Sequence, residues 1–96
     1  MPKKATYIGC LCEPHGDFPP SPISSAASTV FIEGKPAARV GDILVPHTNP
    51  IGITHFPTIV MGSSTVFIEG KPAARVGDNT NCGSKIMNGA STVTIG

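Results

Sequence analysis

One stretch of the sequence, STVFIEGKPAARVGD, occurs twice without a single change, at residues 28–42 and again at residues 64–78. Short repeats of this kind cannot bury their own apolar faces, and they are stabilised by packing against one another. We therefore expect one small domain, residues 1–96, in which similar lobes share a common core.

Each copy of the repeat predicts a β-hairpin. In residues 29–33, Val30 and Ile32 alternate with the side chains beside them, which is the period of a strand with one buried face. Residues 33–36 supply the Gly and Pro of a turn, and residues 37–40 resume a short strand. The Val and Ile positions of all copies are expected to form the common core: Val30, Ile32, Val66, Ile68, Val93 and Ile95.

A third copy is divided between the two ends of the chain. The stretch ASTVTIG at residues 90–96 matches the first half of the repeat, and KKATYIGC at residues 3–10 aligns with KPAARVGD. Tyr7 and Cys10 stand where the full copies have Arg and Asp, so the second match is weak, and a coincidental Lys-Ala-Gly pattern is the alternative. If the alignment holds, the last strand pairs with the first, and three lobes surround an approximate three-fold axis.

The composition favours an all-β fold and excludes several classes of partner. Eleven Gly and ten Pro interrupt the chain, and its longest stretch without either is rich in Ser, Thr and β-branched residues. A net charge of +1 with no basic run argues against nucleic acid and against an anionic membrane as partner. The N-terminus has no apolar segment behind its lysines, so we expect no signal peptide and no membrane span.

The His and Cys residues indicate a metal site. A chain this short buries only a small hydrophobic core. It usually needs disulfides, a metal ion or an oligomeric partner for additional stability. His15 and His47 each follow the end of a repeat by five residues, and Cys82 follows the end of a repeat by four. His55 is placed differently: it lies as far before Ser64 as Cys82 lies before Ser91. Three His and one Cys suit a tetrahedral Zn²⁺, and four protein ligands leave no open position, which is typical of a structural site.

Other groups are given structural roles. Cys10 and Cys12 remain open, either as alternative ligands or as small core residues, and the three thiols are expected to stay reduced. The repeated Arg and Asp are expected to hold each hairpin to its loop rather than to act in catalysis. Glu33 and Glu69 are expected to be solvated or to lie at contacts between lobes.

The stretch KPAARVGD at residues 35–42 and 71–78 resembles the motif of the PAAR-repeat family. The resemblance implies a small cone of three β-lobes with zinc bound near its point by three His and one Cys, here His15, His47, His55 and Cys82. It also implies a broad base that docks on the trimeric β-helical spike of a VgrG protein in the bacterial type VI secretion system. Related tips cap the spikes of contractile phage tails.

The resemblance leads to a specific functional expectation. The protein would be a non-enzymatic spike tip, a monomer that caps a trimer, sharpens it, carries effectors and touches a target membrane only transiently during puncture. It would be assembled in the bacterial cytoplasm and exported at the spike tip, with no fused effector domain. Phe31 and Phe67 are candidate spike contacts, and the lobe with the degenerate motif is expected to be looser.

Three other functions compete with this expectation. The protein is alternatively the tip of a phage tail spike, an adaptor that binds effectors without capping a spike, or a small zinc-dependent hydrolase. The hydrolase would need an open coordination position and a general base near the metal.

Overall fold

The computed structural model describes residues 2–96, and Met1, the first residue of the expected 1–96 domain, lies outside the described residues. Every regular element in this part of the chain is a β-strand of two residues, which confirms the all-β prediction. The strands are β1 (Lys3–Lys4), β2 (Phe31–Ile32), β3 (Lys35–Pro36), β4 (His47–Thr48), β5 (Thr54–His55), β6 (Phe67–Ile68), β7 (Lys71–Pro72) and β8 (Thr94–Ile95). Among the described residues, no helix is long and apolar enough to cross a membrane.

The two full repeats form the predicted hairpins, but their strands are shorter than expected. β2 pairs with β3 through Ile32 and Lys35, and β6 pairs with β7 in the same register. The turn occupies only Glu33 and Gly34, whose φ angles are 52° and 81°. Two central residues at positive φ match the right-handed twist of a tight hairpin, so the expected four-residue turn is replaced by a two-residue one.

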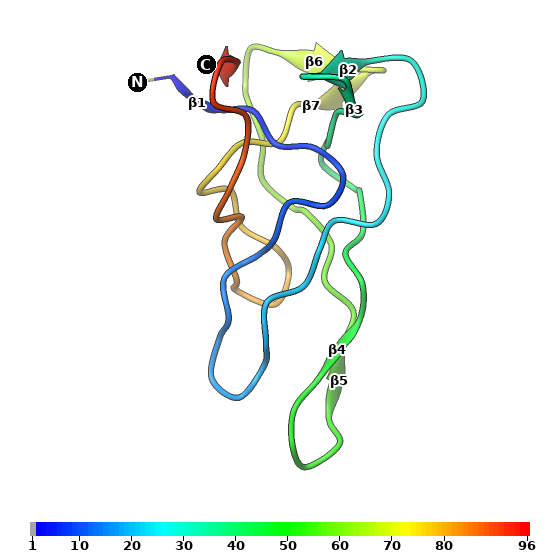
Figure 1. Ribbon diagram of the computed structural model, residues 1–96, viewed down its shortest axis with the longest axis vertical. Helices are drawn as coiled ribbons and strands as arrows, with labels where there is room; N and C mark the ends of the chain where they lie inside the picture. The colour runs from blue at the N-terminus through cyan, green and yellow to red at the C-terminus, as the bar shows by residue number, and fades with distance from the viewer. Residues whose placement is uncertain (1) are drawn as a thin grey trace.

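The first and last strands form the third hairpin. β1 pairs with β8 so that Lys3 faces Ile95, which is the register of Lys35 and Ile32 in the first copy. Figure 1 shows β1 beside the C-terminal end of the chain, level with the hairpins of β2–β3 and β6–β7. We refer to the three lobes as lobe A (residues 28–42), lobe B (residues 64–78) and lobe C (residues 90–96 with 3–10).

The expectation that residues 37–40 continue the hairpin of their own lobe holds only at Ala37, whose amide donates to the Val30 carbonyl (2.9 Å), because the segment otherwise pairs with neighbouring lobes. Isolated bridges join lobe C to lobe A, lobe A to lobe B and lobe B to lobe C; they link Tyr7 with Ala37, Arg39 with Ala73, and Ala5 with Arg75. Since a two-residue strand leaves main-chain groups without partners in its own hairpin, the adjacent lobes must satisfy them.

A closed ring of main-chain hydrogen bonds surrounds the approximate three-fold axis. The Ala38 amide donates to the Thr6 carbonyl (3.0 Å), the Ala74 amide donates to the Ala38 carbonyl (3.0 Å), and the Thr6 amide donates to the Ala74 carbonyl (3.3 Å). All three residues are fully buried. Small side chains at this position allow the three main chains to approach closely, which explains the paired alanines of the repeat.

The core differs in part from the predicted one. Ile32, Ile68 and Ile95 are buried as expected, and Val30 and Val93 are partly buried against them. Val66 is 37% exposed, so its assignment to the core was wrong. The rest of this buried cluster consists of alanines, which the alternating pattern does not reveal: Ala5, Ala27, Ala37, Ala73 and Ala90.

A second apolar cluster lies among the connectors between lobes. It contains Cys10 and Cys12, both almost fully buried, together with Ile23, Leu44, Ile59 and Ile86 and two alanines of the repeats. The two cysteines are therefore core residues, and all three thiols are free, as expected.

The molecule tapers from a broad end to a narrow end along its longest axis. Its principal extents are 39 × 27 × 21 Å. Figure 1 shows the hairpins of the three lobes gathered at the broad end, while the connectors run away from them and return. The longest connector, residues 43–63, forms the antiparallel β4–β5 hairpin at the narrow end. The predicted cone is thus confirmed.

Candidate metal centre

The four residues predicted as metal ligands lie together. One ligand atom from each of His15, His47, His55 and Cys82 can be chosen so that all lie within 4.8 Å of one another. His47 is buried, and the other three are half-buried. Each connector contributes: the first supplies His15, the second supplies His47 and His55, and the third supplies Cys82. This group could therefore hold a metal ion.

Local hydrogen bonds explain how the connectors position these side chains. His47 and His55 face each other across the β4–β5 ladder, where side chains of paired residues lie on the same face. The His15 amide donates to the Phe18 carbonyl (3.1 Å), and the Phe18 amide donates to the His15 carbonyl (2.9 Å), which closes a tight loop. Cys82 lies in a turn in which the Gly83 amide donates to the Thr80 carbonyl (3.1 Å).

The tautomer of His47 is set by a main-chain carbonyl. His47 Nδ1 lies 2.9 Å from the carbonyl oxygen of Pro19, which can only accept a hydrogen bond. Nδ1 therefore carries the proton and Nε2 presents its lone pair to the group, an arrangement common around metal-ligating histidines. His47 Nε2 and His15 Nε2 lie 3.4 Å apart.

The electrostatics of the group favour a neutral imidazole at His15 and a protonated thiol at Cys82 when no cation is bound. Burial, followed by the proximity of His47 and His55, lowers the pKa of His15 below its ordinary value. Burial, with a smaller contribution from Cys12, raises the pKa of the Cys82 thiol. A metal ion needs neutral imidazole and thiolate, so binding would release the proton of Cys82.

The spacing and chemistry of these donors fit zinc. Two nitrogens bound at zinc distances in a tetrahedral site lie about 3.3 Å apart, close to the observed separation of His15 Nε2 and His47 Nε2. Among the buried side-chain nitrogen and oxygen atoms of the described residues, His55 Nδ1 has no hydrogen-bond partner. An unpaired buried nitrogen is costly, and it is expected where a further group completes the site.

Phe18 is a residue of the centre that the sequence did not reveal. Its ring stacks on His55 with centroids 3.7 Å apart and an interplanar angle of 14°, and on His15 at 5.0 Å. Phe18 is nearly buried and shields one side of the imidazoles from water. Because phenylalanine has no ligand atom, only its position three residues after His15 could have indicated this role.

The repeated Arg and Asp residues hold their own loops, as predicted. Arg39 Nε donates to Asp42 Oδ2 (3.0 Å) and Arg39 Nη2 donates to Asp42 Oδ1 (2.8 Å). Arg75 and Asp78 make the same pair of bonds at 3.0 and 2.9 Å. These bidentate pairs fix the chain where it leaves each lobe for its connector.

The two repeated glutamates lie at contacts between lobes, which was one of the two expected outcomes. Glu69 of lobe B accepts a hydrogen bond from the Thr29 amide (2.8 Å) and pairs with Arg39 (2.5 Å), both in lobe A. Glu33 of lobe A accepts from the Thr92 amide of lobe C at 2.9 Å. Hydrogen bonds from Thr29 and Thr92 lower the pKa of Glu69 and Glu33 respectively.

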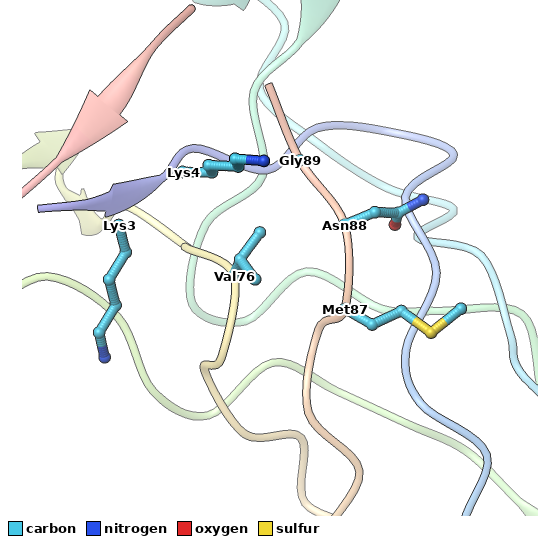
Figure 2. Close-up of a pocket in the computed structure, with 6 residues that line it drawn as sticks. All are labelled: Lys3, Lys4, Val76, Met87, Asn88 and Gly89. Atoms are coloured by element: carbon cyan, nitrogen blue, oxygen red, sulfur yellow. The ribbon is translucent and has the colours of Figure 1, made fainter. Parts of the chain in front are cut away.

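A surface cavity of about 410 Å³ lies beside β1, away from the metal centre. Figure 2 shows Lys3 and Lys4 on one side, Val76 near the middle and residues 87–89 on the other side. None of the four clustered residues lines this cavity, and its lining contains no His, Cys, Asp or Glu. The cavity therefore provides no substrate pocket next to the metal centre.

Comparison with protein families identifies the repeats of this chain. The sequence model of the PAAR motif family matches residues 16–88. The match includes both full repeats and His47, His55 and Cys82. No curated protein matches the chain.

Proposed function

This chain belongs to the PAAR-motif family, and we propose that it is a structural spike tip of type VI secretion machinery, not an enzyme, and that it caps the trimeric β-helical spike of a VgrG-type protein. One chain would cover the end of one trimer. The proposal includes assembly in the bacterial cytoplasm, export on the spike and attachment of effector proteins.

The observation that carries the proposal is the three-fold arrangement of the broad end. The ring through Thr6, Ala38 and Ala74 relates three hairpins within one chain, and a trimeric spike ends in a three-fold face. A single chain with this internal symmetry can make three similar contacts with such a face. A cap of this kind would also cover the unpaired edges at the end of the spike.

The broad end also carries suitable contact residues. Phe31 and Phe67 occupy equivalent positions in lobes A and B and are 58% and 59% exposed. Aromatic side chains are enriched among the residues that dominate protein interfaces. Thr94 takes this position in lobe C, so the contacts on the third side would be smaller.

We also propose that His15, His47, His55 and Cys82 bind one structural Zn²⁺. The donor set and the nitrogen spacing described above support this assignment. Bound zinc would join the three connectors and contribute its binding free energy to folding. The whole described chain, including the lobe formed by residues 3–10 and 90–96, would then be one domain.

Spike capping is tested by mixing the zinc-loaded protein with a trimeric VgrG-type spike and measuring mass by light scattering. We expect one chain per trimer. The double variant Phe31→Asp and Phe67→Asp should weaken binding by roughly a hundredfold. Ile51→Ser, at the opposite end, is the control and should bind normally. Equal binding by all three proteins would contradict the proposed docking face.

A further inference from the structure

The β4–β5 hairpin extends the narrow end beyond the metal centre. We call β4, β5 and the loop of residues 49–53 between them the apex hairpin. Its first and last residues, His47 and His55, belong to the metal centre, so the loop projects past that centre. In Figure 1 this loop lies farther from the broad end than any other segment.

The connector that contains the apex hairpin is uncharged and displays apolar side chains. Residues 43–68 contain no Asp, Glu, Lys or Arg. Ile51, in the loop, is 78% exposed and is the most exposed large apolar residue of the described chain, while Phe56 is 69% exposed and Ile53 is 51% exposed. Exposed apolar patches of this kind mark contacts with proteins or with membranes.

Several polar groups of the loop are satisfied within it. The Asn49 amide donates to the Ile53 carbonyl (3.0 Å), the Gly52 amide donates to the Asn49 carbonyl (3.0 Å), and the Ile53 amide donates to Asn49 Oδ1 (2.9 Å). Pro50 has no amide hydrogen, and the hydroxyls of Thr48 and Thr54 pair at 2.9 Å. These bonds reduce the number of polar groups that would be left unpaired if the tip of the loop entered hydrocarbon.

We propose that the apex hairpin inserts Ile51, with Ile53 and Phe56 behind it, into the hydrocarbon region of a lipid bilayer. The absence of charge complements an uncharged hydrocarbon interior and not a lipid headgroup. A stable protein interface needs ~800 Å² from each partner, more than a narrow loop can offer, whereas lipid needs no complementary shape. The biological meaning rests on the proposed spike-tip function, but the binding itself requires no spike.

The test uses the zinc-loaded full chain and vesicles of zwitterionic phosphatidylcholine. Because the chain contains no Trp, an Ile51→Trp variant provides a single tryptophan at the apex. We expect its emission to shift to the blue with vesicles and to be quenched by lipids brominated on their acyl chains. In flotation assays, the double variant Ile51→Ser and Ile53→Ser should partition less by roughly tenfold or more.

Phe31→Ser at the broad end is the matched control, because Phe31 is also exposed, and it should float like the unmodified protein. Zinc content and melting temperature verify that each variant is folded. The proposal is overturned if the unmodified protein does not float, if Phe31→Ser loses as much binding as the apex variant, or if binding requires anionic lipid. Failure with vesicles while spike binding persists would overturn only this inference, and the reverse result would overturn only the spike proposal.

Discussion

Cys82 is the member of the proposed zinc site that must lose a proton to bind the metal, and its pKa is raised by burial. We expect Cys82→Ala to retain far less than one zinc per chain and to lose roughly 3 kcal/mol or more of unfolding free energy, because metal binding is coupled to folding. Elemental analysis and thermal melts with and without a chelator measure both effects.

Cys10→Ala is the control for this experiment. It removes a buried thiol that lies outside the ligand group and should keep its zinc despite some destabilisation. A Cys82→Ala protein that keeps a full complement of zinc, or a parent protein without zinc that melts cooperatively at the same temperature, would contradict the assignment.

Phe18 is expected to orient the imidazoles through its stacking contacts. Phe18→Leu preserves an apolar side chain but removes the aromatic face against His55. We expect zinc affinity, measured by competition with a chelating dye, to fall by roughly 10–100-fold. Phe56→Leu, at an exposed position, should leave affinity unchanged; a similar loss in both variants would show that the effect is not specific to stacking.

At this scale the sequence predicted the residues that carry ligand atoms and missed those that position them. His15, His47 and Cys82 could be found because their spacing after the repeats is nearly constant, and His55 because it lies as far before Ser64 as Cys82 lies before Ser91. The stacking of Phe18 and the carbonyl of Pro19 could not be found, since neither has a distinctive side-chain chemistry and both act through folded geometry.

At the scale of the hairpins, a glutamate from one lobe caps the start of the next. The folded pKa values of Glu33 and Glu69 are lowered, so their carboxylates stabilise the fold above the ordinary pKa of glutamate. This stabilisation is lost as the pH falls through the lowered values. We expect Glu33→Gln and Glu69→Gln to melt at lower temperature at neutral pH and to show a weaker decline of melting temperature with acidification.

Glu13→Gln is the charge-matched control, because the Glu13 side chain is exposed and makes no hydrogen bond within the described residues. Its melting curve should follow the parent protein from neutral to acidic pH. If Glu33→Gln retains the full pH dependence of the parent, the contacts between lobes do not have the proposed electrostatic role.

Gly89 lies where a connector crosses lobe C with almost no space. A Cβ atom there would lie 2.3 Å from the Ala5 carbonyl oxygen. We expect Gly89→Ala to cost roughly 1–3 kcal/mol in urea denaturation, because main chain must move. The equivalent position of lobe A already holds alanine, so Ala26→Gly should cost about 1 kcal/mol or less; equal stability of Gly89→Ala and the parent would refute the close approach.

Hairpins were predictable from alternation and turn residues, but their partners were not. The sequence indicated a strand over residues 37–40, whereas Ala37 and Arg39 pair with neighbouring lobes. The alternation of apolar and other residues indicates which face of a strand is buried. It does not indicate which segment of the chain accepts hydrogen bonds from the amides of that strand. The exposure of Val66 could not be predicted from alternation either, because the equivalent Val30 and Val93 follow the same pattern and are partly buried against the core.

At the scale of the whole molecule, the pairing of β1 with β8 leads to a prediction about connectivity. Lys3 and Ile95 have the register of a two-residue hairpin. A circular permutant should therefore fold when Glu-Gly joins Ile95 to Lys3 and new ends are opened between Glu33 and Gly34. We expect the permutant to bind zinc and melt within a few degrees of the parent protein; an unfolded permutant would contradict the single-domain proposal.

The ring of main-chain bonds through Thr6, Ala38 and Ala74 has a mechanical consequence. If the broad end is held and the point is pushed along the long axis, the load tends to wedge the three lobes apart. The ring then behaves as a hoop, in which all three bonds are stretched together and share the tension. A hairpin pulled at one end opens bond by bond, but a hoop resists until its bonds yield collectively, so we expect the molecule to resist compression more strongly than the opening of one hairpin.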